Sequence, residues 1–151
     1  MKVRIFLILI LTLFLAESNF SQKLPKNLKK YLDRNFSGWK LAGKCYEKEN
    51  TRILVGDFDG NKKSDYAIKF VRGEKGFMMA FLGTGGRYRP FYLHIYSADQ
   101  ANFSDLILFK KGESYEPAGT PVFRFDAPAD FGCESDIGGI HAYRNGKFIA
   151  Y

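Results

Sequence analysis

Four oxygen-bearing side chains are closely spaced in the stretch GDFDGNKKSDYAI, which spans residues 56–68. Asp57, Asp59, Asn61 and Asp65 are separated by two, two and four residues. Calcium takes roughly six to eight oxygen ligands, and a tight turn with ligands at alternate positions brings such oxygens to one point. With the main-chain carbonyl of Lys63 as a further ligand, the stretch predicts a calcium site. The alternative is a polar turn between two strands that holds no ion.

The order of these residues resembles the calcium loops of FG-GAP and VCBS repeats, whose pattern runs Asp-x-Asp/Asn-Gly-Asp/Asn-Gly-x-x-Asp before an apolar strand. Five positions match residue for residue: Asp57, Asp59, Gly60, Asn61 and Asp65. Lys62 stands where the repeats usually have glycine. The resemblance implies a structural Ca²⁺ ion that ties two strands together. It covers one loop, DFDGNKKSD, so it does not imply a full propeller, which needs several such blades.

An EF-hand is a different type of calcium loop, and it is excluded here. Counted from Asp57, the twelfth position is Ile68, where an EF-hand has a bidentate glutamate. The residues on either side also have the pattern of strands and not of helices.

Two histidines are the other candidates for chemistry. Strand alternation in FYLHIYS predicts that His94 shares one face with Tyr92 and Tyr96, and His141 lies in GIHAYR near the predicted C-terminal hairpin. Either histidine could act as a general base, or the two could meet across a sheet as ligands of a transition metal. A strand histidine with neither role is the simpler interpretation. None of the following serines lies in a nucleophile-elbow pattern: Ser37, Ser104 and Ser114.

Four carboxylates cluster in FDAPADFGCESDIGG: Asp126, Asp130, Glu134 and Asp136. Two of them could act as acid and base on a glycan. Sequence spacing does not fix the distance between carboxylates, so an irregular surface loop held by Cys133 is the simpler interpretation of the cluster. The sequence therefore assigns no catalytic residue.

The chain has two cysteines, Cys45 and Cys133. An even number of cysteines in a chain sent to an oxidising compartment predicts a disulfide. The alternative is two separate thiols, one of them a nucleophile. The residues beside each cysteine do not favour a reactive thiol, because Glu134 and Asp136 would raise the pKa of a Cys133 thiol.

The N-terminus has the pattern of a secretory signal peptide. Lys2 and Arg4 precede an apolar run that ends near Ala16, and polar residues follow at once. This run is shorter than the roughly 20 residues that span a bilayer. We therefore predict a signal peptide over residues 1–21, cleaved after Ser18 or Ser21, and a protein that is secreted or lies in the periplasm or cell envelope. No stable membrane insertion is expected after cleavage.

The composition bounds the classes of partner. The formal net charge is +7, which favours anionic partners such as acidic glycans or lipid headgroups. The lysines are scattered along the chain, however, so a solvated basic surface is the simpler interpretation. No nucleic-acid partner is expected for a secreted protein of this kind.

The remaining residues, 22–151, are predicted to form one compact domain. Apolar residues recur every fourth position over residues 24–36, which predicts an amphipathic helix. Strand patterns and short turns follow from residue 39, and the Asn145-Gly146 pair predicts a type I′ hairpin. The expected fold is mainly β within the α+β class. An N-terminal helix packs on an antiparallel, hairpin-connected sheet or sandwich.

Aromatic residues suggest a binding surface. Tyr88, Tyr92 and Tyr96, with Phe91, could present one sheet face to an unknown protein or glycan; alternatively, these rings fill the core. The sequence thus predicts a secreted, non-catalytic binding or interaction module with a structural calcium loop. The alternatives are a small extracellular hydrolase that uses a histidine and acidic residues, and an inhibitor of a secreted enzyme.

Overall fold

The structure is a computed structural model of the chain, and it describes residues 24–43, 45, 52–133 and 138–151. The predicted signal peptide, residues 1–21, lies outside the described residues. The described part is mainly β, with two antiparallel sheets and few helices. This confirms the predicted fold class at that level. Among these residues, no helix is both apolar and long enough to cross a membrane.

The first sheet contains five strands, all paired antiparallel. They are β1 (Lys40–Leu41), β2 (Ile53–Gly56), β3 (Asp65–Arg72), β4 (Lys75–Gly83) and β5 (Tyr88–Ser97). Both β1 and β2 pair with the same edge of β3, and β4 and β5 continue the sheet on the other side. Short turns connect β3, β4 and β5, as expected for antiparallel neighbours.

The second sheet contains four strands in sequence order. They are β6 (Ser104–Phe109), β7 (Ala127–Gly132), β8 (Gly138–Arg144) and β9 (Lys147–Ala150). The turn between β8 and β9 has positive φ at Asn145 (51°) and Gly146 (84°), as a type I′ turn requires. Two short helices flank β6: α3 (Ala98–Asn102) before it, and the 3₁₀ helix η1 (Glu116–Ala118) after it.

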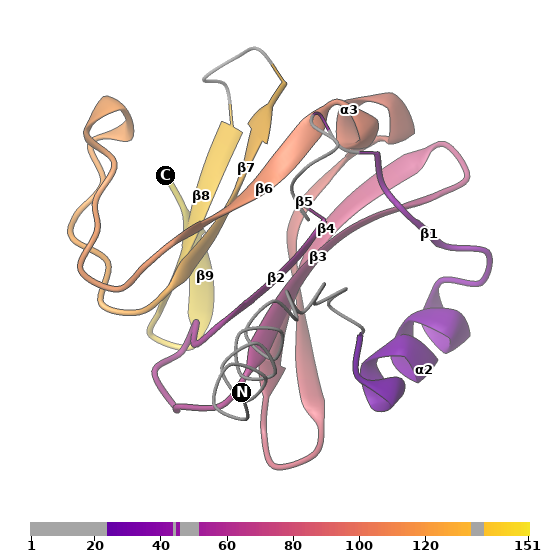
Figure 1. Cartoon of the computed structure of the whole chain (residues 1–151), viewed down its shortest axis with the longest axis horizontal. Coiled ribbons are helices and arrows are strands. Elements are labelled where there is room, and N and C mark those ends of the chain that lie inside the picture. Colours follow the sequence, from indigo (N-terminus) through magenta and orange to yellow (C-terminus); the bar gives the residue numbers. More distant parts are fainter. Residues whose placement is uncertain (1–23, 44, 46–51, 134–137) are drawn as a thin grey trace, which may run out of the picture.

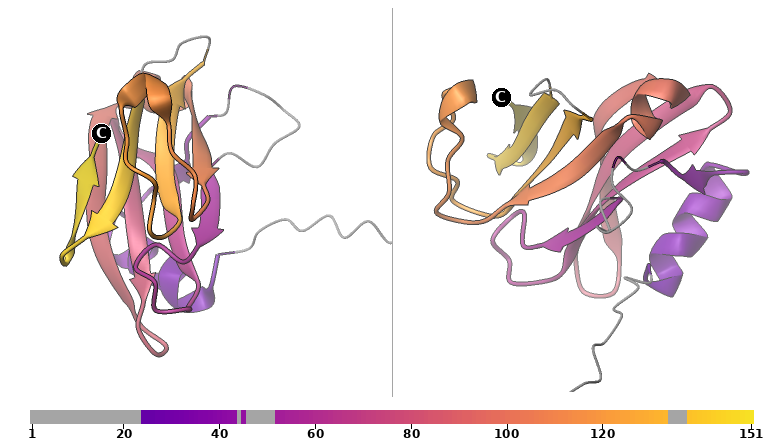
Figure 2. Two further views of the ribbon diagram at one scale, coloured as in Figure 1. Left: turned by 90° about the vertical axis from the view of Figure 1, so that its left-hand side faces the viewer. Right: turned by 45° about the horizontal axis from the view of Figure 1, so that its top comes forward.

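Helix α2 (Lys26–Asn35) packs on one face of the first sheet, and the second sheet lies against the other face (Figures 1 and 2). Leu28 and Leu32 are fully buried one turn apart on the helix face that meets the sheet. The helix ends at Asn35. The next residue, Phe36, is the C-cap: its φ of −132° lies outside the helical region, and its amide still donates to the Leu32 carbonyl.

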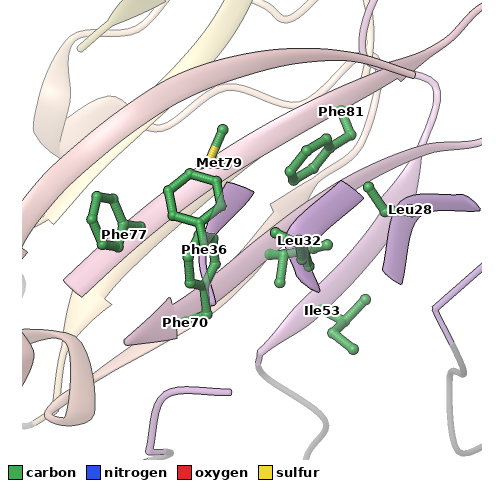
Figure 3. Packing of buried hydrophobic residues seen from close by; sticks show 9 residues of the cluster. Leu28, Leu32, Phe36, Ile53, Phe70, Phe77, Met79 and Phe81 are labelled. Carbon is green, nitrogen blue, oxygen red and sulfur yellow. The ribbon is translucent and has the colours of Figure 1, made fainter. Parts of the chain in front are cut away.

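Aromatic rings fill the layer between α2 and the first sheet (Figure 3). The Phe36 ring meets the rings of Phe70 and Phe77 edge to face, and those two rings stack with centroids 5.2 Å apart. Edge-to-face and offset pairs add to the free energy of burial. Residues of β4 after Lys75 are buried because layers cover both faces of this strand.

A second core lies between the two sheets. Small side chains, Ala67 on β3 and Ala80 on β4, are fully buried there, which lets the sheets approach closely. Phe91 on β5 contacts Tyr143 and Phe148 of the β8–β9 hairpin, with ring centroids 5.9 and 5.4 Å away. The protein is therefore layered as helix, sheet and sheet.

Candidate functional site

The acidic stretch connects β2 to β3 as a tight loop over residues 57–64. Its turn uses two residues of positive φ, Gly60 at 80° and Lys62 at 63°. Glycine adopts this region at no steric cost, whereas a lysine does so less readily. A Cβ added at Gly60 would overlap the Phe125 ring. The loop therefore packs closely against the segment that leads into β7.

Side chains within the loop fold it by capping its own amides. Asp57 accepts hydrogen bonds from the amides of Gly60 (2.9 Å) and Lys62 (3.1 Å). Asp59 accepts from the Asn61 amide (3.1 Å), and the Asn61 carboxamide oxygen accepts from the Lys63 amide (2.7 Å). A carboxylate oxygen has two lone pairs, so these bonds fix the oxygens in place and leave capacity for a cation.

Asp65, the residue that follows the loop, connects the loop to the first sheet through its side chain. It is fully buried and begins β3, and its two oxygens accept from the amides of Phe58 and Gly83, each at 2.7 Å. Burial raises the pKa of Asp65 to about 6; the two amide donors oppose this rise, and the nearby Asp59 and Asp57 carboxylates add to it. Bringing three carboxylates together thus has an electrostatic cost that a cation would remove.

The structure brings together the three predicted carboxylate ligands. Oxygens of Asp57, Asp59 and Asp65 all lie within 4.8 Å of one another. Asn61 and Lys63, the other two predicted ligands, lie on the same turn, and the Asn61 side-chain nitrogen also donates to the Gly83 carbonyl at 3.0 Å. Their ligation of an ion stays a prediction. The spacing read from the sequence did locate a real convergence of carboxylates.

Asp126 is a neighbour of this loop that the sequence did not reveal. Its carboxylate accepts from the amide of Asp57 at 3.3 Å, and its own amide donates to the Asp57 carbonyl at 3.2 Å. Lys110 lies 3.4 Å from the same carboxylate. Two segments 69 residues apart meet here, and no local pattern in the sequence signals such a contact.

A second group of polar side chains gathers at the opposite end of the sandwich, around a pocket of about 360 Å³. We call it the inter-sheet pocket, because its walls come from β5, α3, β6, β7 and β8. They include His94, Tyr96, Phe103, Ser104 and Asp130. Along β3, Asp65 at the acidic loop and Lys69 behind the pocket are four residues apart, or about 13 Å at roughly 3.3 Å per residue.

Asp130 joins two histidines of different sheets. Its Oδ2 lies 3.4 Å from His94 Nδ1 on β5, and its Oδ1 lies 3.6 Å from His141 Nε2 on β8. The Asp130 and His141 side chains are almost completely buried, whereas about half of the His94 side chain is exposed. Asp130 Oδ1 and His141 Nε2 have no hydrogen-bond partner among the described residues. His94 is therefore held by a buried carboxylate and is open to the pocket.

Lys69 lies behind the pocket wall and was not singled out by the sequence. It is fully buried on β3, and its Nζ donates to Ser104 Oγ at 3.2 Å. Burial lowers the pKa of Lys69 to about 8, against the Asp105 and Asp130 carboxylates, which raise it. From the sequence alone, a lysine on a strand is expected to face solvent. The second sheet covers this face, and the sequence of β3 alone does not show that.

The predicted tyrosine surface is not formed as one face. A bulge between Met78 and Met79 shifts the pairing of β4 with β5, so that successive side chains of β5 change sides there. Tyr88 and Tyr92 contact residues of the α2 side, whereas the Tyr96 ring packs beside His94, tilted by 55°, in the inter-sheet pocket. The prediction that Tyr92, His94 and Tyr96 share a face is therefore wrong.

Cys45 and Cys133 form a disulfide, with their Cα atoms 5.5 Å apart. This confirms the predicted pairing. The Cys45 amide also donates to Asp105 at 2.9 Å, and the Cys133 amide donates to the Phe103 carbonyl at 2.8 Å. The bridge thus ties the connection before β2 to the rim of the inter-sheet pocket.

The four carboxylates considered as a glycosidase pair are dispersed. Asp126 is hydrogen-bonded to the acidic loop, whereas Asp130 lines the inter-sheet pocket, so the two carboxylates do not share a site. Glu134 and Asp136 lie outside the described residues.

Comparison with known proteins gives no significant match, whether to a family model, to a curated protein or to a solved structure.

Proposed function

We propose that the protein is a secreted binding module whose acidic β2–β3 loop holds one structural Ca²⁺ ion. The convergence of Asp57, Asp59 and Asp65 within 4.8 Å carries the calcium proposal. Hard oxygen donors grouped on one turn are the ligands that calcium prefers. The ion would offset the repulsion among three carboxylates, one of which is fully buried.

A structural role for the ion follows from the connections of the loop. Asp65 is hydrogen-bonded to Gly83 at the end of β4, and the main chain of Asp57 is hydrogen-bonded to Asp126, the residue that directly precedes β7. An ion bound by these carboxylates would therefore fix a loop that joins the first sheet to the segment leading into the second sheet. The inter-sheet pocket, at the other end of the strands, would then be the place for a ligand or a partner group.

Thermal unfolding with calcium and with a chelator tests the calcium proposal. At a free calcium concentration 100 times the dissociation constant, the gain in stability should be about 2.7 kcal/mol. The double variant Asp57→Asn, Asp59→Asn should remove the difference, while Asp99→Asn in α3, far from the loop, should keep it. Equal melting temperatures in millimolar calcium and in chelator would exclude the site.

A second candidate function is a small extracellular hydrolase. The observation that favours it is the 3.4 Å approach of His94 Nδ1 to the buried Asp130 at a pocket. A carboxylate that orients an imidazole is the arrangement of a general base. Hydrolysis of chromogenic esters that is lost in His94→Gln would support this candidate, and no turnover by the wild-type protein would exclude it for esters. An inhibitor of a secreted enzyme is a special case of the binding module proposed above: the two differ only in that the inhibitor's partner is an enzyme.

A further inference from the structure

The inter-sheet pocket contains a serine whose hydroxyl is hydrogen-bonded to a buried amine. Ser104 begins β6 and lines the pocket, and its Oγ accepts from Lys69 Nζ at 3.2 Å. Ser104 is 7% exposed and Lys69 is fully buried. A hydroxyl and a base within hydrogen-bond reach, at the wall of a pocket, is the arrangement by which a weak nucleophile is activated.

The surroundings of Lys69 set how readily it can accept a proton. Burial favours the neutral amine, and the positive charge of Arg52 acts in the same direction. The Asp105 and Asp130 carboxylates act in the opposite direction. The resulting pKa of about 8 leaves an appreciable fraction of neutral amine in mildly alkaline solution. The ordinary value of 10.5 would leave almost none.

Tyr96 provides a hydrogen-bond donor beside the serine. Burial and the nearby Asp130 carboxylate raise the pKa of the Tyr96 hydroxyl, while the neighbouring Ser104 hydroxyl lowers it. The net shift is upward, so the hydroxyl keeps its proton at any physiological pH. A neutral hydroxyl in a water-poor site can stabilise a negatively charged oxygen that develops next to it.

We propose that Ser104 is a nucleophile activated by Lys69 for the hydrolysis of small esters bound in the inter-sheet pocket. This inference rests on the hydrolase candidate, and it names the nucleophile and the substrate class that the candidate lacks. His94, held by Asp130, lies at the same pocket and can position the leaving group.

The reaction is an acyl transfer in two halves. Ser104 Oγ attacks the ester carbonyl carbon while its proton passes to neutral Lys69 Nζ, and the carbonyl oxygen becomes an oxyanion beside the Tyr96 hydroxyl. The carbon–oxygen bond to the alcohol breaks, and the alcohol leaves with the proton from Lys69. Water then attacks the acyl-serine and gives a proton to Lys69. The acid is released, and Ser104 Oγ recovers that proton.

The pocket limits the substrate to a small, neutral ester. About 360 Å³ is at the lower end of the range of ligand pockets, which run from roughly 300 to 1,000 Å³. Phe103, 70% exposed, stands at its wall and offers an apolar surface to an acyl or alcohol group. Asp130 lines the same pocket, so a negatively charged ester would be repelled.

A fluorophosphonate probe tests the nucleophile directly. Such a probe forms a bond between Ser104 Oγ and phosphorus and releases fluoride. Intact-protein and peptide mass spectrometry should find one adduct, on Ser104. Ser104→Ala should lose the adduct and lower p-nitrophenyl acetate hydrolysis by about 100-fold or more. Ser114→Ala, in an exposed segment before η1, is the matched control and should keep both.

The pH dependence of labelling tests Lys69 without a variant that might not fold. In the wild-type protein the labelling rate should rise through a midpoint near pH 8, as the amine loses its proton. Lys69→Met, if its circular dichroism shows a folded protein, should label more slowly by about 100-fold or more. A rate that does not change between about pH 6 and 9.5 would overturn the role of Lys69.

The outcomes separate this inference from the hydrolase candidate. Ester hydrolysis that survives in Ser104→Ala but is lost in His94→Gln would overturn the serine nucleophile and keep the candidate. No adduct and no hydrolysis by the wild-type protein would overturn both. An adduct on another residue, with Ser104 unmodified, would also overturn the inference.

Discussion

The side chain of Asp65 and the main chain of Gly83 are joined by a buried hydrogen bond of 2.7 Å. Asp65 begins β3 and Gly83 ends β4, so the bond links the acidic loop to the adjacent strand of the sheet. The same carboxylate accepts the amide of Phe58 on the other side. The state of this one carboxyl group therefore affects both the loop and the sheet.

The first prediction concerns stability and pH in the presence of a chelator. The pKa of Asp65 is about 6 in the folded protein, against an ordinary value of 3.8. The folded state therefore holds the proton more tightly than the unfolded chain does. The stability that this proton contributes is complete below about pH 3.8 and is lost as the pH rises through about 6.

Urea unfolding at a series of pH values measures this effect. From about pH 4 to about pH 6, the free energy of unfolding of the wild-type protein should fall relative to that of Asp65→Asn, whose side chain does not titrate. Parallel pH curves for the two proteins would contradict the raised pKa.

The second prediction concerns calcium affinity and pH. A proton and a calcium ion compete for Asp65, so the apparent affinity should decrease as the pH falls through about 6. Calorimetric titrations at pH 7.5 and pH 5 should show this decrease, together with the release of protons when the ion binds at pH 5. An affinity that is equal at both values would mean that Asp65 is not a ligand.

The third prediction concerns the turn of the acidic loop. Gly60→Ala places a Cβ against the Phe125 ring at a positive φ, whereas Gly86→Ala meets nothing within 4 Å at a similar φ of 90°. Both changes incur the backbone cost of about 1–2 kcal/mol. Gly60→Ala should lower the free energy of unfolding by about 1–3 kcal/mol more. If chemical denaturation shows the same loss of unfolding free energy for Gly60→Ala and Gly86→Ala, the loop does not pack against Phe125.

The fourth prediction concerns the disulfide. Cys45 and Cys133 are 88 residues apart in sequence, and a cross-link over such a loop stabilises a protein by about 4–5 kcal/mol in the chain-entropy model. The double variant Cys45→Ser, Cys133→Ser should lose stability of this order in urea. Adding a reductant should destabilise the wild-type protein and leave the variant unchanged. Two reactive thiols in the unfolded, unreduced wild-type protein would contradict the bridge.

Local patterns were sufficient for part of this structure. The acidic loop was recognisable because its oxygen-bearing side chains lie within nine residues, and the Asn145-Gly146 turn because its backbone demands those residue types. The disulfide followed from the number of cysteines. The loop and the turn are determined by residues close together in the sequence, and the disulfide could be predicted from the number of cysteines alone.

Long-range relationships were not predictable in the same way. The pairing of His94 with Asp130 depends on how two sheets are placed face to face, and the burial of Lys69 depends on the same packing. The strict alternation assumed for β5 fails at the bulge, which the sequence of β5 does not mark with a glycine. The inter-sheet pocket is therefore a product of tertiary packing.

The bulge in β5 has a further consequence for the protein in a crowded solution. β5 is the outer strand of the first sheet, and an outer strand with a regular row of free amides and carbonyls can recruit another chain into an extended sheet. The bulge leaves Leu93 outside the register, and Pro90 on the same strand has no amide hydrogen. Together they interrupt the row, so this edge is a poor template for aggregation.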